Sequence, residues 1–207
     1  MDRKAIKEEA KAKIKGNLWT IWKALLVVSL VSFGISFVAG ILDGAIFGNE
    51  ENAMTLFSSL ATLAVVPLSV GSISYILKFS RGEKPEVKEV FDFYKNILPI
   101  LGVTILVSIF VSLGFILLIV PGIIVSFMLC MTTYMMAEGR TDVWQIIKDS
   151  AAMMKGHKWE YFVFGLSFIG WILLCGITLG IASIYVIPYM STAQCIWYDK
   201  LKALNNK

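Results

Sequence analysis

The sequence predicts an all-α, polytopic membrane protein of about six transmembrane helices, arranged as three hairpins that are each preceded by a cytoplasmic-surface amphipathic helix. Three observations support this prediction. Of the 207 residues, 57% are hydrophobic and 16% are charged, whereas soluble domains carry about 25% charged residues. Long stretches contain no charged residue, and the basic residues lie only between alternate stretches. Because no polar linker separates two cores, residues 1–207 are expected to form a single membrane domain.

The expected spans follow from the charge-free stretches. A helix needs roughly 20 apolar residues to cross the hydrocarbon core, where lipid offers the backbone no hydrogen-bond partners. Residues 24–42 and 53–77 are each long enough for one span, and residues 97–137 and 161–198 are each long enough for a helical hairpin. The expected count is therefore six.

Five residues are candidate breaks in these helices. Pro121-Gly122 and Gly180 lie near the middle of the two hairpin stretches, where a tight outer turn explains them best. Pro67 and Pro188 lie inside expected spans. For these two prolines the question is open whether they unwind their helices to form a binding site at membrane depth.

The basic residues set the expected orientation, because Lys and Arg concentrate on the cytoplasmic side of membrane proteins. All 19 lie before residue 24, at 78–95, at 140–158 or after residue 199, whereas the first outer loop carries only Asp43, Glu50 and Glu51. Both termini are therefore expected in the cytoplasm. Since topology explains the positive charge, no nucleic-acid partner is expected.

Residues 84–96 and 141–155 are amphipathic segments between spans. Apolar side chains recur in both at helical spacing, and the N-terminal segment shows a weaker version of the pattern. The residues on these faces are Val87, Val90, Phe91 and Tyr94, then Val143, Ile146, Ile147 and Met154 together with the polar Ser150, and at the N-terminus Ile6, Ala10 and Ile14. We expect the two segments to be helices that lie flat on the inner leaflet, with their apolar faces turned toward lipid or the bundle.

Short sequence echoes indicate an internal repeat. Residues 114–118 (GFILL) resemble residues 170–174 (GWILL), and residues 15–19 (KGNLW) resemble residues 155–159 (KGHKW). Each copy would consist of a surface helix followed by a transmembrane hairpin. Since each copy begins on the cytoplasmic side of the membrane, the repeats would be parallel and not inverted. The expected boundaries are 1–80, 81–139 and 140–207, although biased composition in apolar sequence produces similar echoes.

The six expected spans contain no charged residue. Intramembrane proteases and carboxylate-driven antiporters need polar or ionisable groups at depth, so both classes are disfavoured. Cys130, Cys175 and Cys195 lie in apolar stretches without CxxC spacing, which disfavours metal and redox chemistry. We therefore expect no enzymatic activity, no cofactor and no metal. The only histidine, His157, lacks the paired nucleophile or acid that a catalytic role requires.

The candidate functional residues lie at two helix entrances with the pattern Lys-Gly-x-x-Trp. They are Lys15, Trp19, Lys155, His157 and Trp159. These five residues are expected to form a joint site at the cytoplasmic surface that recognises an anionic headgroup or a peptide partner. Each basic residue contributes about 1 kcal/mol to binding near an anionic surface. The alternative is generic anchoring, in which Trp19, Trp22, Trp159 and Trp197 act independently at the interface.

Several motifs spread over most of the chain resemble those of one family. They are KGNLW at 15–19, PGI at 121–123, Ser150 with MKGHKW at 154–159, LSFIGW at 166–171, TLGI at 178–181 and Pro188-Tyr189. In these motifs the chain resembles the Firmicute integral membrane proteins grouped as domain of unknown function nine-seven-five. The resemblance implies a multi-helix membrane protein of a Gram-positive bacterium, and it implies no particular activity.

The functional expectation is a non-enzymatic protein of the bacterial plasma membrane, either permease-like or a lipid- or peptide-handling accessory subunit. Its expected partners are membrane lipids, together with a bound or transported lipid or peptide, or a partner membrane protein. A structural or immunity-type protein that acts through a partner is the alternative, and a membrane enzyme of lipid metabolism ranks third. A continuous lipid-sized cavity would favour transport, whereas a solid bundle would favour a scaffold.

The orientation can be tested by cysteine-accessibility labelling of intact cells. Asn49→Cys should react with a membrane-impermeant reagent added outside, because residue 49 lies in the acidic outer loop. Lys148→Cys should not react, because it lies in a basic inner loop. Labelling of Lys148→Cys but not of Asn49→Cys would contradict the expected orientation.

Overall fold

The computed structural model describes residues 2–48 and 55–205, and within them it contains helices and no strand. Asn49, Glu50 and Glu51 of the expected outer loop lie outside the described residues. The elements are α1 (Arg3–Ile14), α2 (Leu18–Phe47), α3 (Leu56–Ser80), the 3-10 helix η1 (Val87–Asn96), α4 (Ile97–Leu117), α5 (Ile119–Leu129), α6 (Thr132–Ala137), α7 (Val143–Met153), α8 (Lys158–Leu166), α9 (Ile169–Ile177) and α10 (Ser183–Asn205).

Among the described residues, five stretches are long and apolar enough to cross a membrane. They are α2, α3, η1 with α4, α5 with α6, and α8 with α9. Their length and composition make the chain an all-α, multi-pass membrane protein. The sixth expected span corresponds to α10, which is a continuous helix of 23 residues. It is not among the five, and its last turns carry Asp199, Lys200 and Lys202.

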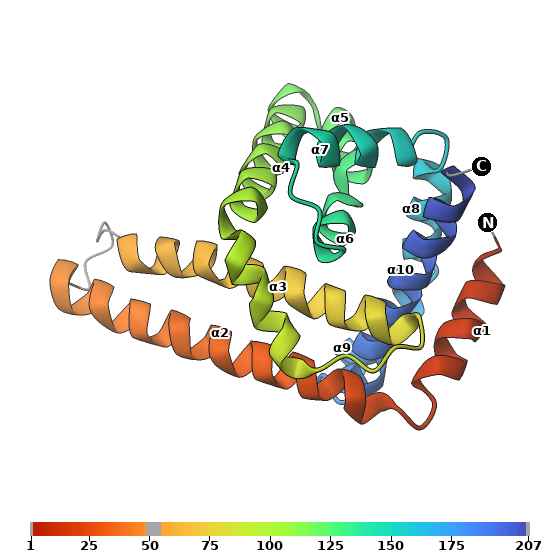
Figure 1. Cartoon of the computed structure of the whole chain (residues 1–207), viewed down its shortest axis with the longest axis horizontal. Coiled ribbons are helices and arrows are strands. Elements are labelled where there is room, and N and C mark those ends of the chain that lie inside the picture. The colour runs from red at the N-terminus through yellow and green to blue at the C-terminus, as the bar shows by residue number, and fades with distance from the viewer. Residues whose placement is uncertain (1, 49–54, 206–207) are drawn as a thin grey trace.

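The hairpins diverge instead of forming one compact bundle. The pair α2 and α3 and the pair α4 and α5 each pack closely, but the two pairs extend in different directions (Figure 1). Only 6% of the most apolar segment of α2 is buried. The central helix is α3, which contacts α2, η1, α4, α6 and α10. Much of the apolar surface of the outgoing helices is therefore left for lipid to cover.

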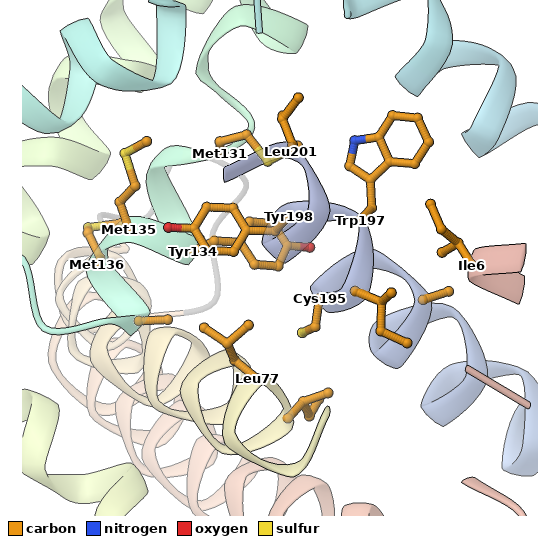
Figure 2. Packing of buried hydrophobic residues seen from close by; sticks show 14 of the residues in the cluster. Ile6, Leu77, Met131, Tyr134, Met135, Met136, Cys195, Trp197, Tyr198 and Leu201 are labelled. Atoms are coloured by element: carbon orange, nitrogen blue, oxygen red, sulfur yellow. The ribbon is translucent and has the colours of Figure 1, made fainter. Parts of the chain in front are cut away.

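The core forms where α3, α6 and α10 meet. The rings of Tyr134 on α6 and Tyr198 on α10 stack with centroids 5.2 Å apart, and Leu77 of α3 belongs to the same cluster (Figure 2). Trp197 is fully buried and stacks on Phe164 with ring centroids 4.6 Å apart. Trp197 is therefore a core residue and not the interfacial anchor that its position near a span end predicted, since rings of this size contribute most of a core's buried area.

The N-terminal helix is covered by protein. Ile6, Ala10 and Ile14 are fully buried and have no solvent-accessible surface, because α1 lies along α10. An ion pair between Glu9 and Lys200, with an N–O distance of 2.8 Å, joins the two helices. The amphipathic pattern thus identified the buried face correctly, and its cover is α10.

The other two amphipathic segments also bury part of their apolar faces. In η1, Val90 is fully buried and the Tyr94 hydroxyl donates to the Ala64 carbonyl at 2.8 Å, whereas Phe91 is 38% exposed. In the second segment, Ile147 of α7 and the adjoining Met154 are buried. Both segments are helical, as expected, although the first is a 3-10 helix.

The turn of the second hairpin lies before the expected one. The chain reverses at Leu118, between α4 and α5, and Pro121 occupies the first turn of α5, where no N–H is needed. Gly122 allows close packing instead. A Cβ on Gly122 would lie 2.5 Å from the Phe115 ring, and a Cβ on Gly114 would lie 2.9 Å from the Gly122 Cα. The expected break at Pro121-Gly122 is therefore corrected to Leu118.

The remaining candidate breaks divide into two kinds. Gly180 lies in the turn between α9 and α10 with a φ of 90°, the left-handed region that favours glycine, so this turn is as expected. Pro67 and Pro188 lie inside the continuous helices α3 and α10. Neither proline unwinds its helix, because packing against neighbouring helices maintains the turns on both sides of the lost hydrogen bond.

Asp43 closes the first hairpin. Its carboxylate accepts hydrogen bonds from the backbone N–H groups of Phe57 and Ser58, both at 2.8 Å, at the start of α3. An acid on one helix therefore caps the N-terminus of its neighbour, where the helix dipole favours negative charge. These bonds explain how α2 accommodates a buried carboxylate near its end.

The close approach of η1 to α3 depends on Gly71, because a Cβ at this position would lie 2.3 Å from the Val90 carbonyl oxygen. Gly71→Ala should displace η1 and lower the midpoint of thermal unfolding in detergent, at a cost of about 1–3 kcal/mol. Gly34→Ala on α2 is the matched control, since nothing lies within 4 Å of its added Cβ. The control should be neutral or stabilising, and equal midpoints for the two variants would contradict the packing argument.

Candidate functional site

Both Lys-Gly-x-x-Trp segments form the same local structure, a turn that leads from an amphipathic helix, α1 or α7, into the next helix. Gly16 and Gly156 have φ values of 81° and 85°, which a residue with a Cβ rarely adopts. Trp19 and Trp159 are 65% and 72% exposed. The sequence echo is thus also an echo in backbone conformation, and it leaves an exposed indole at each helix entrance.

The structure does not bring the two segments together. The loop from α1 to α2 and the loop from α7 to α8 lie toward opposite ends of α1 (Figure 1). Lys15 and Trp19 are therefore remote from the segment around His157. In that second segment, the Nδ1 atom of His157 lies 2.9 Å from an oxygen of Glu160, one turn along α8. We call these two turns, from α1 to α2 and from α7 to α8, the first and the second corner. They are separate and form no joint site.

A polar cavity lies beside the first segment. It measures about 600 Å³ and is lined by Ala12, Lys13, Asn17, Thr20, Phe79, Gly82, Glu83, Lys84 and Pro85. We call it the corner cavity, because it lies between the turn from α1 to α2 and the loop after α3. Two lysines and one carboxylate line it. The N-cap of α2, Asn17, makes no side-chain capping bond, so the positive end of this helix adds to the charge of the lysines.

An ionic cluster, which the sequence did not predict, joins the ends of three helices. It consists of Arg81 after α3, Glu138 after α6, and Asp199 and Lys202 on α10. Arg81 donates to Asp199 through Nε at 3.1 Å and to Glu138 through Nη2 at 2.6 Å. Lys202 donates to both oxygens of Glu138 at 2.7 Å, and the Tyr198 hydroxyl donates to Glu138 at 2.8 Å. These bonds hold the three helix ends together.

Glu138 lies at the centre of the ionic cluster. It and Arg81 are the C-terminal caps of α6 and α3, each followed by a glycine with positive φ, Gly139 or Gly82. The Glu138 side chain is only 13% exposed. Burial opposes its ionisation, but the hydrogen bonds from Lys202 and Arg81 outweigh this effect and hold the pKa of Glu138 below its ordinary value.

Two adjoining cavities lie next to the ionic cluster. One measures about 430 Å³ and lies between α3, η1 and the end of α6, and the other measures about 480 Å³ and extends to Arg81 and Lys202. Both are lined by Ser74, Lys78, Ala137 and Glu138. We call the second one the cluster cavity. Lys78, on the shared wall, pairs with Glu89 of η1 at an N–O distance of 2.8 Å.

The apolar stretch made of α8 and α9 is interrupted near its middle, which the sequence did not predict. The carbonyl of Ser167, between the two helices, accepts a hydrogen bond from Lys7 of α1 at 2.7 Å. The same ammonium lies 4.4 Å from the centre of the Phe168 ring. Burial of the ammonium lowers the pKa of Lys7 from its ordinary value. A charged group thus reaches this stretch from another helix and satisfies the carbonyl at the break.

The residues of the ionic cluster are far apart in the sequence, and the periodicity within one segment does not indicate pairs of this kind. One signal was present. Gly82 and Gly139 each follow a charged residue at the end of an apolar stretch, which is typical of helix C-termini. This pattern would have placed Arg81 and Glu138 at equivalent positions, although it would not have shown that they meet.

Glu138→Gln should lower the midpoint of thermal unfolding in detergent, because two cations lose their carboxylate and the free energy of unfolding falls by about 2–3 kcal/mol. Folding lowers the pKa of Glu138, so its contribution is complete above the ordinary pKa of 4.5 and is lost as the pH falls through the lowered value. Below pH 4.5 the wild-type midpoint should therefore fall more steeply than that of the variant. Glu86→Gln, from an exposed pair with Lys88, is the control and should match wild type. Parallel pH profiles of wild type and Glu138→Gln would contradict this role.

Comparison with known proteins identifies a family. No curated protein and no solved structure matches the chain. A family model described as protein of unknown function (DUF975) matches residues 1–121 and residues 113–205. Since these matches together cover nearly the whole sequence, the chain belongs to this family of proteins of unknown function.

Proposed function

We propose that this protein is a non-enzymatic, multi-pass protein of the bacterial plasma membrane that binds anionic lipid at its cytoplasmic face, as a lipid-handling accessory protein. Both termini lie in the cytoplasm in this proposal. The observation that carries it is the position of the corner cavity. A lysine-lined polar cavity adjoins the start of α2, a helix whose most apolar segment is only 6% buried.

The corner cavity suits a phospholipid headgroup. A phosphate there would lie among Lys13, Lys84 and Asn17. Lysine ammonium groups form charge-assisted hydrogen bonds with phosphate oxygens, and these bonds are shorter and stronger than those between neutral groups. The volume of about 600 Å³ falls within the range of roughly 300–1,000 Å³ that is typical of small-molecule sites.

The exposed face of α2 suits the acyl chains of the same lipid. Large apolar side chains recur along one side of the helix at intervals of seven, four, three and four residues, which places them on one stripe. These exposed residues are Trp19, Leu26, Leu30, Phe33 and Phe37. The stripe begins beside Thr20 of the corner cavity, so one lipid would contact both. The second corner, with Lys155 and Trp159, is assigned generic anchoring.

Native mass spectrometry of the full chain in the presence of phosphatidylglycerol tests the proposal. Wild type should retain the lipid, and Lys84→Gln should bind it about fivefold more weakly, because one basic residue contributes about 1 kcal/mol near an anionic lipid. Trp19→Ala should also weaken retention. Lys155→Gln is the matched control, because it removes one lysine from the other corner, and it should retain lipid like wild type.

Equal retention by wild type, Lys84→Gln and Trp19→Ala would refute the corner cavity as a lipid site. Retention of phosphatidylcholine to the same extent as phosphatidylglycerol would contradict the preference for negative charge. Co-purification of another membrane protein in place of lipid would favour the structural or immunity-type alternative.

A further inference from the structure

We infer that the corner cavity selects an anionic lipid whose headgroup also carries a primary ammonium group, and that Glu83 is the residue that recognises this ammonium. The inference rests on the proposed function, because it concerns the same cavity, and it adds which headgroup the cavity prefers. The charged residues in the lining are Lys13, Lys84 and Glu83. The lysines suit a phosphate, whereas a carboxylate repels one and suits a cation.

Glu83 differs from the other acidic residues that the structure describes. Each of the others has an ion pair or a hydrogen bond through its carboxylate. No described residue forms either kind of contact with the carboxylate of Glu83. Carboxylates form strong, charge-assisted hydrogen bonds with ammonium groups. A headgroup ammonium would therefore provide the contact that the protein itself does not.

The backbone fixes Glu83 at the wall of the cavity. The N–H of Glu83 donates to the carbonyl of Lys78, and the N–H of Gly82 donates to the carbonyl of Phe79, both at 3.0 Å. Gly82 has a φ of 86°. These three features are those of the Schellman motif, which ends α3 here. The Glu83 side chain thus starts from a defined position, as specific recognition requires.

The lysines of the cavity differ in what they already contact. The Lys13 ammonium donates to the Ser80 carbonyl and lies 3.6 Å from an oxygen of Glu9, whereas Lys84 forms no ion pair with a described residue. One unpaired cation and one unpaired carboxylate, at consecutive positions, match a headgroup that carries both signs of charge. The positive end of α2 at Asn17 adds to the phosphate side, so the complementary lipid keeps a net negative charge.

Two pairs of lipids isolate the ammonium group. Phosphatidylserine and phosphatidylglycerol have the same net charge, but only phosphatidylserine carries an ammonium. Phosphatidylethanolamine and phosphatidylcholine also have the same net charge. The first has a primary ammonium with three N–H donors, like that of lysine, and the second has a trimethylated nitrogen with none. A hydrogen bond to Glu83 therefore favours one member of each pair.

The test is native mass spectrometry of the full chain with each pair of lipids in competition. Wild type should prefer phosphatidylserine over phosphatidylglycerol, and phosphatidylethanolamine over phosphatidylcholine, by about threefold, which is typical of an exposed ion pair. Glu83→Gln should remove both preferences. It should weaken the retention of phosphatidylserine and strengthen that of phosphatidylglycerol, which no longer faces a negative charge. A folding defect would weaken both.

Two further variants complete the test. Glu86→Gln is the matched control, because Glu86 pairs with Lys88 and does not line the cavity, and it should keep both preferences of wild type. Lys84→Gln should weaken phosphatidylserine and phosphatidylglycerol to the same extent, because both carry the phosphate that Lys84 contacts. Failure of the lipid proposal and failure of this inference therefore give different results.

Four results would overturn the inference. Retention of phosphatidylglycerol that depends on Lys84, without any preference for phosphatidylserine, would leave the lipid proposal standing and refute the ammonium site. Equal effects of Glu83→Gln on the two anionic lipids would refute the role of Glu83. A preference for phosphatidylserine without one for phosphatidylethanolamine would show that the serine carboxylate is recognised instead. Retention of none of the four lipids would refute both proposals.

Discussion

The meeting of α3, α6 and α10 at the ionic cluster is the constraint on which the arrangement of the hairpins depends. Each is the returning part of a hairpin and carries a charge at its end: Arg81, Glu138 or Lys202. The outgoing helix α2 packs mainly against its own partner. In a bilayer, moving an apolar side chain from contact with lipid to contact with another helix gains little free energy, because both surroundings are apolar. Charge-assisted hydrogen bonds, in contrast, have a defined direction. The cluster therefore determines how the helix ends meet, and the aromatic core packs below it.

The features that depend on one segment could be predicted from the sequence. Charge-free stretches predicted the apolar helices, because the cost of a charge in hydrocarbon applies to each helix separately. The cover of an amphipathic face could not be predicted, since Ile6, Ala10 and Ile14 have the same spacing whether lipid or α10 lies against them. The turn at Leu118 was missed because proline and glycine mark both turns and close helix packing, and here Gly122 serves packing.

Of the candidate site residues, Lys15 and Trp19 lie near the corner cavity, whereas Lys155, His157 and Trp159 form a separate corner. The cluster cavity was not predicted, because it is assembled from helix ends that are distant in sequence. The Lys and Arg residues whose distribution indicates membrane orientation are commonly regarded as hydrogen-bonded to water and lipid headgroups. Here Arg81 and Lys202 are committed to partly buried pairs, so the same charges that bias insertion also connect helices.

The position of α1 against α10 has a consequence for biosynthesis. Helix α1 is synthesised well before α10, against which it packs, and at roughly 5–20 residues per second the two are separated by about 10–40 seconds of translation. During that interval the apolar stripe of α1 lacks its final cover, and the membrane surface or a chaperone is the available substitute. Docking of α1 therefore follows the synthesis of α10 and joins two helices that are distant in sequence, and a protease added during synthesis would cleave α1 more readily before α10 covers it.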